Sequence, residues 1–89
     1  MNFREFIEIL YDIAVIEMPK NRELRRKILS ATPNTNLCDD CGMDSVTFTE
    51  TLLCLEQQFN LDTLVECVTP GTTLGTLHTT IQNQTAQAA

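Results

Sequence analysis

At residues 38–59 the chain reads CDDCGMDSVTFTETLLCLEQQF, and a polar loop turns into a helical pattern at Ser45. Asp44 is a good cap for such a helix, because its carboxylate can accept hydrogen bonds from the free N–H groups of the first turn. Gly42 lets the loop bend where a side chain would clash. A helix start also carries partial positive charge, so an anion on Ser45 would gain about 0.3–1 kcal/mol at an exposed site. Ser45 is therefore either a plain cap or a site that another enzyme modifies.

The context of Ser45 is not that of a catalytic serine. A nucleophilic serine needs a base within hydrogen-bond reach and usually a third group that orients the base. The single histidine, His78, lies in a late segment. The residues around Ser45 do not read Gly-x-Ser-x-Gly, and no strand pattern precedes them. The sequence therefore argues against a serine hydrolase.

Residues 46–59 predict the central helix. Apolar side chains recur at spacings of four, three and four residues and form a stripe of Phe48, Leu52, Leu55 and Phe59. We expect this stripe to pack against the first helix. The turn of an α-helix then places on the other side Thr47, Glu50, Cys54 and Gln57, bordered by Leu53.

The run GMDSV, followed by a helix that ends in LEQQF, resembles the acyl carrier protein family. Members of this family carry a 4′-phosphopantetheine arm on the serine of an Asp-Ser-Leu motif. The family's Gly, Asp and Ser fall on Gly42, Asp44 and Ser45, and Val46 stands in place of its Leu. The resemblance covers residues 34–83.

The resemblance implies an all-α four-helix bundle of the acyl-carrier type, with a short third helix that gates access to the arm. It implies a discrete carrier whose Ser45 receives the arm from coenzyme A through a phosphopantetheinyl transferase. The terminal thiol then carries an acyl or aminoacyl group as a thioester between partner enzymes of fatty-acid, polyketide or nonribosomal-peptide type. Those enzymes touch the exposed side of the central helix, formed here by Thr47, Glu50, Leu53, Cys54 and Gln57.

Two features depart from the family pattern. The exposed side of the central helix is less acidic than is usual, which implies partners that recognise shape and apolar contact more than charge. Thr49 and Thr51 stand where apolar residues are common, which affects the volume of any cavity that holds the acyl group. The weakly acidic helix face, Val46 and the basic segment 20–27 leave open an alternative, a carrier-like protein-protein interaction module that is never loaded.

The chain upstream of the loop predicts two helices. In residues 3–18 the apolar residues follow the i, i+3, i+4, i+7 spacing of an amphipathic helix. Ile9 and Ile16 widen its apolar face, as in a helix packed on two neighbours, and Pro19 ends it. Residues 20–30 predict a second short helix, which would be a possible extra helical turn after Pro19 beside the four main helices.

Between the predicted helices, residues 31–44 read as a loop that Leu37 anchors in the core. Residues 60–69 hold a short helix at best, which Asp62 can cap. Because such a piece makes few buried contacts, we expect it to be the most mobile element.

The last helix is predicted for residues 73–83, with Thr72 or Thr73 as its cap. Residues 1–84 then form a single carrier domain, and 85–89 form a disordered tail without an anchor. No strand with a convincing period of two residues is visible.

Charge is distributed unevenly along the chain. Six basic and twelve acidic residues give a net charge of −6, and all six basic residues precede residue 30. The acidic second part argues against nucleic acid as a partner, because phosphates demand Lys and Arg. It suits basic partner surfaces. The basic cluster of Arg22, Arg25, Arg26 and Lys27 is interpreted as a solvated helix face, with a nucleic acid or a membrane surface as the alternative.

The four cysteines include a C-x-x-C pair, Cys38 and Cys41. A redox pair would need the strand setting of thioredoxin, and a zinc site with Cys54, Cys67 or His78 would need a second ligand pair, so we expect no metal. No apolar run approaches the ~20 residues of a membrane span. The acidic N-terminal segment is not a signal peptide. The expectation is a cytoplasmic monomer with free thiols.

Overall fold

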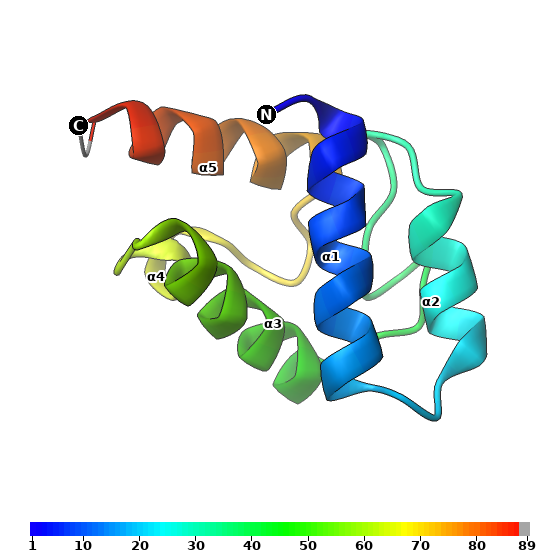
Figure 1. Ribbon diagram of the computed structural model, residues 1–89. Coiled ribbons are helices and arrows are strands. Elements are labelled where there is room, and N and C mark those ends of the chain that lie inside the picture. Colours follow the sequence, from blue (N-terminus) through cyan, green and yellow to red (C-terminus); the bar gives the residue numbers. More distant parts are fainter. Residues whose placement is uncertain (88–89) are drawn as a thin grey trace.

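Figure 1 shows the computed structural model of the chain, in which residues 1–87 are described. These residues form five helices, namely α1 (Phe3–Glu17), α2 (Arg22–Leu29), α3 (Ser45–Phe59), α4 (Leu64–Cys67) and α5 (Leu74–Gln87). Within this range the only β-type pairing is an isolated antiparallel bridge between Asn36 and Thr73. The predicted all-α fold of the acyl-carrier type is confirmed.

Local hydrogen bonds explain where the helices begin and end. Asn2 and Glu5 form a reciprocal capping box at the start of α1. The helix ends before Pro19, as predicted. The side chain of Asn21 accepts from the N–H of Leu24 at 3.1 Å and starts α2. At the other end of the central helix, Asn60 takes the left-handed conformation, with φ of 56°, and stops α3.

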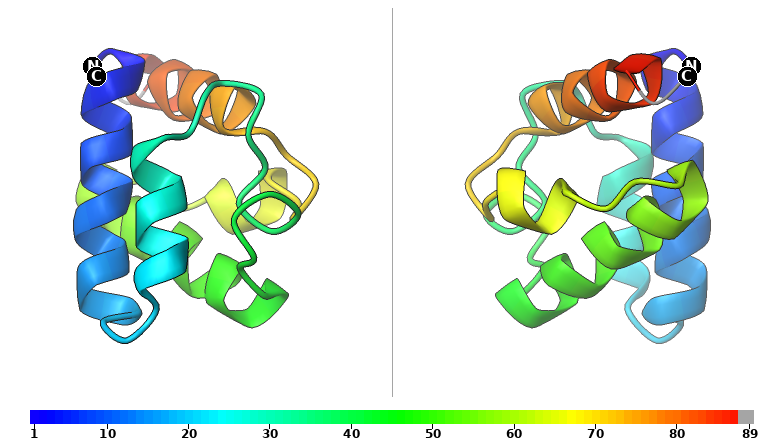
Figure 2. Two further views of the ribbon diagram at one scale, coloured as in Figure 1. Left: turned by 90° about the vertical axis from the view of Figure 1, so that its right-hand side faces the viewer. Right: turned by 90° about the vertical axis from the view of Figure 1, so that its left-hand side faces the viewer.

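The core is built from apolar side chains of all five helices. Helix α1 contacts α2, α3 and α5, and α3 also contacts α4. Figure 2 shows α2 beside α1 and the last helix, α5, across one end of the bundle. The predicted stripe of α3 is buried at Phe48, Leu52 and Leu55, and Phe59 is partly buried. Leu37 of the long loop is 1% exposed, which confirms it as the anchor of that loop.

The loop that precedes α3 is fastened to the start of α5. The N–H of Leu74 donates to the Thr35 carbonyl, and that of Gly75 to the Pro33 carbonyl, both at 2.8 Å. Residue 75 must be glycine for this approach, because a Cβ there would lie 2.8 Å from Pro33 Cβ and 2.9 Å from its carbonyl oxygen. The contact spans about forty residues of sequence, and it positions the loop that leads to Ser45.

Four expectations need correction. The second short helix predicted for residues 20–30 is confirmed as α2, but with eight residues it is longer than the extra turn that was allowed for after Pro19. Helix α5 runs to Gln87, so residues 85–87, expected in a disordered tail, are helical, while 88–89 lie outside the described residues. Asp62 was expected to cap the short helix, but the N-cap residue of α4 is Thr63, and its side chain forms no capping hydrogen bond. Ile16 is 75% exposed and does not widen the buried face of α1, because it lines an open depression between α1 and α3.

Across residues 1–87 we find no helix with the length and apolar character that crossing a membrane requires.

Candidate functional site

Ser45 is the first residue of α3, and its side chain is exposed. The residue before it, Asp44, has extended backbone angles and caps the helix, as predicted. Its Oδ1 accepts a hydrogen bond from the Thr47 N–H at 2.7 Å. That backbone bond, followed by one from the Thr47 side chain, holds the pKa of the Asp44 carboxyl below its ordinary value. Asp44 is therefore ionised at neutral pH and holds the first turn in place.

The chain reaches Ser45 through a turn that is tied to the core. Gly42 has φ of +82°, a conformation that L side chains rarely adopt, so this turn favours glycine. The expected reason, a clash with a side chain, is wrong, because a Cβ at residue 42 would meet no heavy atom within 4 Å. Immediately after it, the N–H of Met43 donates to the Leu37 carbonyl at 3.1 Å. Leu37 and Met43 are both buried. Ser45 thus follows, by two residues, a methionine that is fixed in the interior.

The hydroxyl of Ser45 has no activating neighbour. Within residues 1–87, its Oγ forms no hydrogen bond with any side chain, and only its carbonyl is engaged, accepting from Thr49 Oγ1 at 3.0 Å. His78 stacks on the ring of Phe6 with centroids 5.3 Å apart, and its Nε2 lies 3.1 Å from the Met1 carbonyl. The histidine therefore packs at the N-terminal end of α1, whereas α3 begins toward the opposite end of the bundle (Figures 1 and 2). This arrangement does not support catalysis by Ser45 itself.

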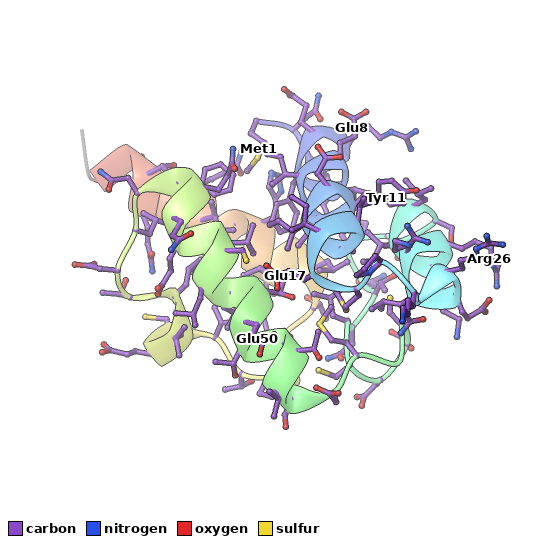
Figure 3. The ribbon with its side chains drawn as sticks, turned by 60° about the horizontal axis from the view of Figure 1, so that its bottom comes forward. Met1, Glu8, Tyr11, Glu17, Arg26 and Glu50 are labelled. Atoms are coloured by element: carbon purple, nitrogen blue, oxygen red, sulfur yellow. The ribbon has the colours of Figure 1, made fainter. Side chains whose placement is uncertain are left out.

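The residues predicted on the outer side of α3 fall into two groups. Glu50, Leu53 and Gln57 are exposed, whereas Thr47 and Cys54 are partly buried. Cys54 lies at the seam with α1, because its Sγ is 3.5 Å from Glu17 Oε1. Figure 3 shows Glu17 between the two helices, with Glu50 further toward the start of α3.

The seam between α1 and α3 contains a surface depression of about 360 Å³, lined by Ile13, Ile16, Glu17, Cys54, Gln57 and Gln58. Partial burial, and then the hydrogen bond to Glu17, raise the pKa of the Cys54 thiol. Cys54 thus belongs to this seam as much as to the outer face of α3.

One exposed apolar residue was not predicted as part of the outer face. Val46 follows Ser45 directly and is 68% exposed, and Leu53, seven residues later, is 48% exposed. A spacing of seven residues is about two turns, so Val46 and Leu53 share one side of α3. The sequence signal was the position of Val46 outside the Phe48–Leu55 stripe.

The two threonines that depart from the family pattern have different surroundings. Thr49 is exposed and bonds only to its own helix. Thr51 is 2% exposed, and its hydroxyl donates to the Thr47 carbonyl at 2.9 Å. The bond to the preceding turn satisfies the buried hydroxyl, so Thr51 replaces an apolar core residue without leaving a polar group unpaired.

Helix α4 flanks the far end of α3. Its Leu64 is buried, and the N–H of Val65 donates to Glu56 Oε2 of α3 at 3.2 Å. The side chain of Val65 is 38% exposed. A single helical turn is thus held to α3 by one buried leucine and one backbone-to-carboxylate bond.

The cysteines are free thiols in this structure. Burial raises the pKa of Cys38 and that of Cys41. In the part of the chain that the structure describes, no three His, Cys, Asp or Glu side chains come together as a set that could hold a metal ion. The C-x-x-C pair therefore lacks the further ligands that a zinc site requires.

Comparison with known proteins gives one finding. The family model of the phosphopantetheine attachment site matches residues 21–77, well over half of the chain. No curated protein and no solved structure matches. The matched range runs from α2 to the first turn of α5 and includes Gly42, Asp44 and Ser45, whereas α1 lies outside it.

Proposed function

The chain belongs to the phosphopantetheine attachment family, and we propose that it is an acyl or aminoacyl carrier in which Ser45 is the attachment residue. The family carries covalently attached 4′-phosphopantetheine. The observation that carries the proposal is the exposed Ser45 at the first position of α3, behind the Asp44 cap and inside the matched range.

The surroundings of Ser45 fit such a group. The side chain is exposed, and the next residue, Val46, is 68% exposed, so a long substituent can leave the protein without displacing core residues. The first turn of a helix offers N–H donors and partial positive charge to a phosphodiester. The Thr47 N–H already donates to the Asp44 carboxylate, and this negative charge limits how closely the phosphodiester can approach.

In this proposal the protein performs no bond chemistry itself. Ser45 contributes the hydroxyl, and a phosphopantetheinyl transferase contributes the base, because no side chain among residues 1–87 bonds to Ser45 Oγ. The attached group supplies a thiol that holds cargo as a thioester. Its flexible link raises the concentration of cargo at a partner's site to the millimolar range. The cargo class extends over fatty-acid, polyketide and nonribosomal-peptide intermediates.

We assign the partner contacts to the outer side of α3, next to the attachment point. Its exposed members are Val46, Glu50, Leu53 and Gln57, with Thr47 and Cys54 at the edges. Two apolar side chains beside one carboxylate favour recognition by shape and apolar contact more than by charge. Such a contact is small, which suits a monomeric carrier that passes its cargo on through transient complexes in the cytoplasm.

The proposal is tested by intact mass. The chain contains two serines, Ser30 and Ser45, which provide a matched pair of variants. Ser30 caps the end of α2, and its Oγ lies 3.3 Å from the Lys27 carbonyl. Incubation with coenzyme A and a broad-specificity transferase should add one phosphopantetheine to the wild type and to Ser30→Ala, and none to Ser45→Ala. A wild type that gains no mass, or a gain on Ser45→Ala, would contradict the assignment.

A second candidate function is an interaction module that keeps the bundle and is never loaded. It is favoured by Val46 in place of the family's Leu and by the outer side of α3, which presents Glu50 as its one exposed carboxylate. Top-down mass spectrometry of the protein from its native cell separates the two candidates. A native protein with the mass of the arm on Ser45 excludes the unloaded module.

A further inference from the structure

Helix α2 presents a basic side that the proposed carrier function does not use. Residues at i, i+3, i+4 and i+7 lie along one side of a helix. On α2 these positions are Arg22, Arg25, Arg26 and Leu29, and together with Tyr11 of α1 they line a surface depression of about 220 Å³. Figure 3 shows Tyr11 on the side of α1 toward α2, and Arg26 on α2 away from α3.

Two of the four cations of α2 already have a partner. Arg26 pairs with Glu23 at 2.6 Å, and Lys27 approaches the same carboxylate at 3.8 Å. Across residues 1–87, Arg22 and Arg25 form no ion pair, although Glu8 and Asp12 of α1 flank Tyr11. Arg22 and Arg25 at the depression therefore have no carboxylate in direct contact within this part of the chain.

Arg25 shows a second sign of a missing partner. Its Nε is buried and has no hydrogen-bond acceptor. Buried donors are normally paired, because an unpaired one loses its bond to water without replacement. A guanidinium presents a planar fork that fits a carboxylate with two parallel hydrogen bonds. A carboxylate placed in the depression would supply the acceptor that Arg25 lacks.

The chemistry of the depression favours an acidic protein surface over other polyanions. The seven acidic and zero basic residues from residue 31 onward would repel an extended nucleic acid that reaches beyond α2, whereas a short acidic segment contacts only the depression. A bilayer would need several exposed apolar side chains, and the α2 side of the depression offers only Leu29, 46% exposed. Arg and Tyr around an apolar residue are, by contrast, the side chains enriched at protein-protein interfaces.

We propose that the depression between α1 and α2 is a docking site for an acidic segment of a partner protein, whose carboxylates bind Arg22 and Arg25 and whose apolar side chain contacts Leu29. The site lies on the α1–α2 side, whereas the exposed residues of α3 lie on another (Figure 3). A partner bound to α2 would leave Ser45 free. The protein can then stay attached to one protein while α3 meets another.

The test is an NMR titration of the full-length, isotope-labelled chain with an amidated peptide of Glu, Ala and Leu. A matched peptide with Gln in place of every Glu is the control. The expected result is saturable shifts at Tyr11, Arg22, Arg25 and Leu29 with the Glu peptide only. Arg22→Glu should weaken binding about tenfold. Arg4→Glu, an equal change of charge at an exposed residue outside the depression, should weaken it less than about twofold.

Arg25→Glu is expected to weaken binding as Arg22→Glu does. If the partly buried Arg25 is needed for folding, the exposed Arg22 still decides the question. Unsaturable shifts, equal binding of the Gln peptide, or equal loss in Arg4→Glu would overturn the proposal. So would tighter binding to phosphatidylserine vesicles or duplex DNA, or an Arg22-dependent dimer in sedimentation. The result should be the same on Ser45→Ala, so it does not depend on the proposed carrier function.

Discussion

Replacement of Gly42 by alanine isolates one property of the loop before Ser45, its backbone conformation. A Cβ added at Gly42 would meet no heavy atom within 4 Å, so the substitution causes no steric clash. The residue nevertheless has φ of +82°. Holding an L side chain in the left-handed region costs about 1–2 kcal/mol. The whole effect on stability should therefore come from backbone strain.

Gly71→Ala is the matched control. Its φ lies outside the positive range, and its nearest contact is an ordinary one, 3.8 Å to Thr69 Oγ1. Both substitutions also restrict the unfolded chain, which stabilises the fold by about 0.4–1 kcal/mol in each case. The difference between the two variants removes this shared contribution. We expect Gly42→Ala to be less stable than Gly71→Ala by about 1–2 kcal/mol.

Urea denaturation measures this difference directly, and thermal melting gives a second reading. For a domain of this size, each kcal/mol corresponds to about 4–8 °C in Tm. Gly42→Asn should fall between the wild type and Gly42→Ala, since Asn tolerates the left-handed conformation better than Ala does. Equal stability of Gly42→Ala and Gly71→Ala would refute the reasoning, because it would mean that residue 42 does not need a positive φ.

Three further predictions follow from single contacts. The lowered pKa of Asp44 stabilises the fold above the ordinary carboxyl value of 3.8, and this contribution is lost as pH falls through the lower pKa of the folded state. The stability of the wild type should therefore drop toward that of Asp44→Asn over this acid range, and a pH-independent difference between the two in urea denaturation would argue against it. Gly75→Ala, whose Cβ would lie 2.8 Å from Pro33 Cβ, should destabilise by about 1–3 kcal/mol, and unchanged thermal melting would disprove that approach. Leu55 is 0% exposed, so Leu55→Ala should lower the free energy of unfolding by about 2–5 kcal/mol. Leu53 is 48% exposed, so Leu53→Ala should change it by less than about 0.5 kcal/mol in the same urea denaturation assay. Similar losses in both variants would contradict the observed burial.

The site was predictable to the extent that its signals are local. Asp44 accepts from a residue three positions away, and the turn at Gly42 depends on one φ angle. Both are properties of a few consecutive residues, so the pattern GMDSV was enough to predict a capped helix start at Ser45. The stripe of α3 followed from helical spacing alone and is buried as expected.

Side-chain surroundings could not be predicted in the same way. Cys54 was expected on the outer side of α3, yet its thiol lies 3.5 Å from Glu17, a residue 37 positions earlier. Ile16 was expected in the core and is 75% exposed. Helical periodicity gives the direction of a side chain around its own axis. It does not say whether a neighbouring helix lies close enough to cover that side chain.

The extension of α5 to Gln87 was not predicted from the sequence. No Gly or Pro follows residue 75 to mark an end, and the polar residues after Ile81 gave no signal of continued helix.

Sequence alone determined the helical class, the caps and the position of Ser45, because these rest on hydrogen bonds and spacings within a few residues. Tertiary structure decided which charges remain without a partner, as at Arg25, whose buried Nε lacks an acceptor. It also decided that the loop before Ser45 is tied to α5 through the Gly75–Pro33 contact. The physical reason is that burial and pairing are set by contacts between distant residues, which exist only once the helices have come together.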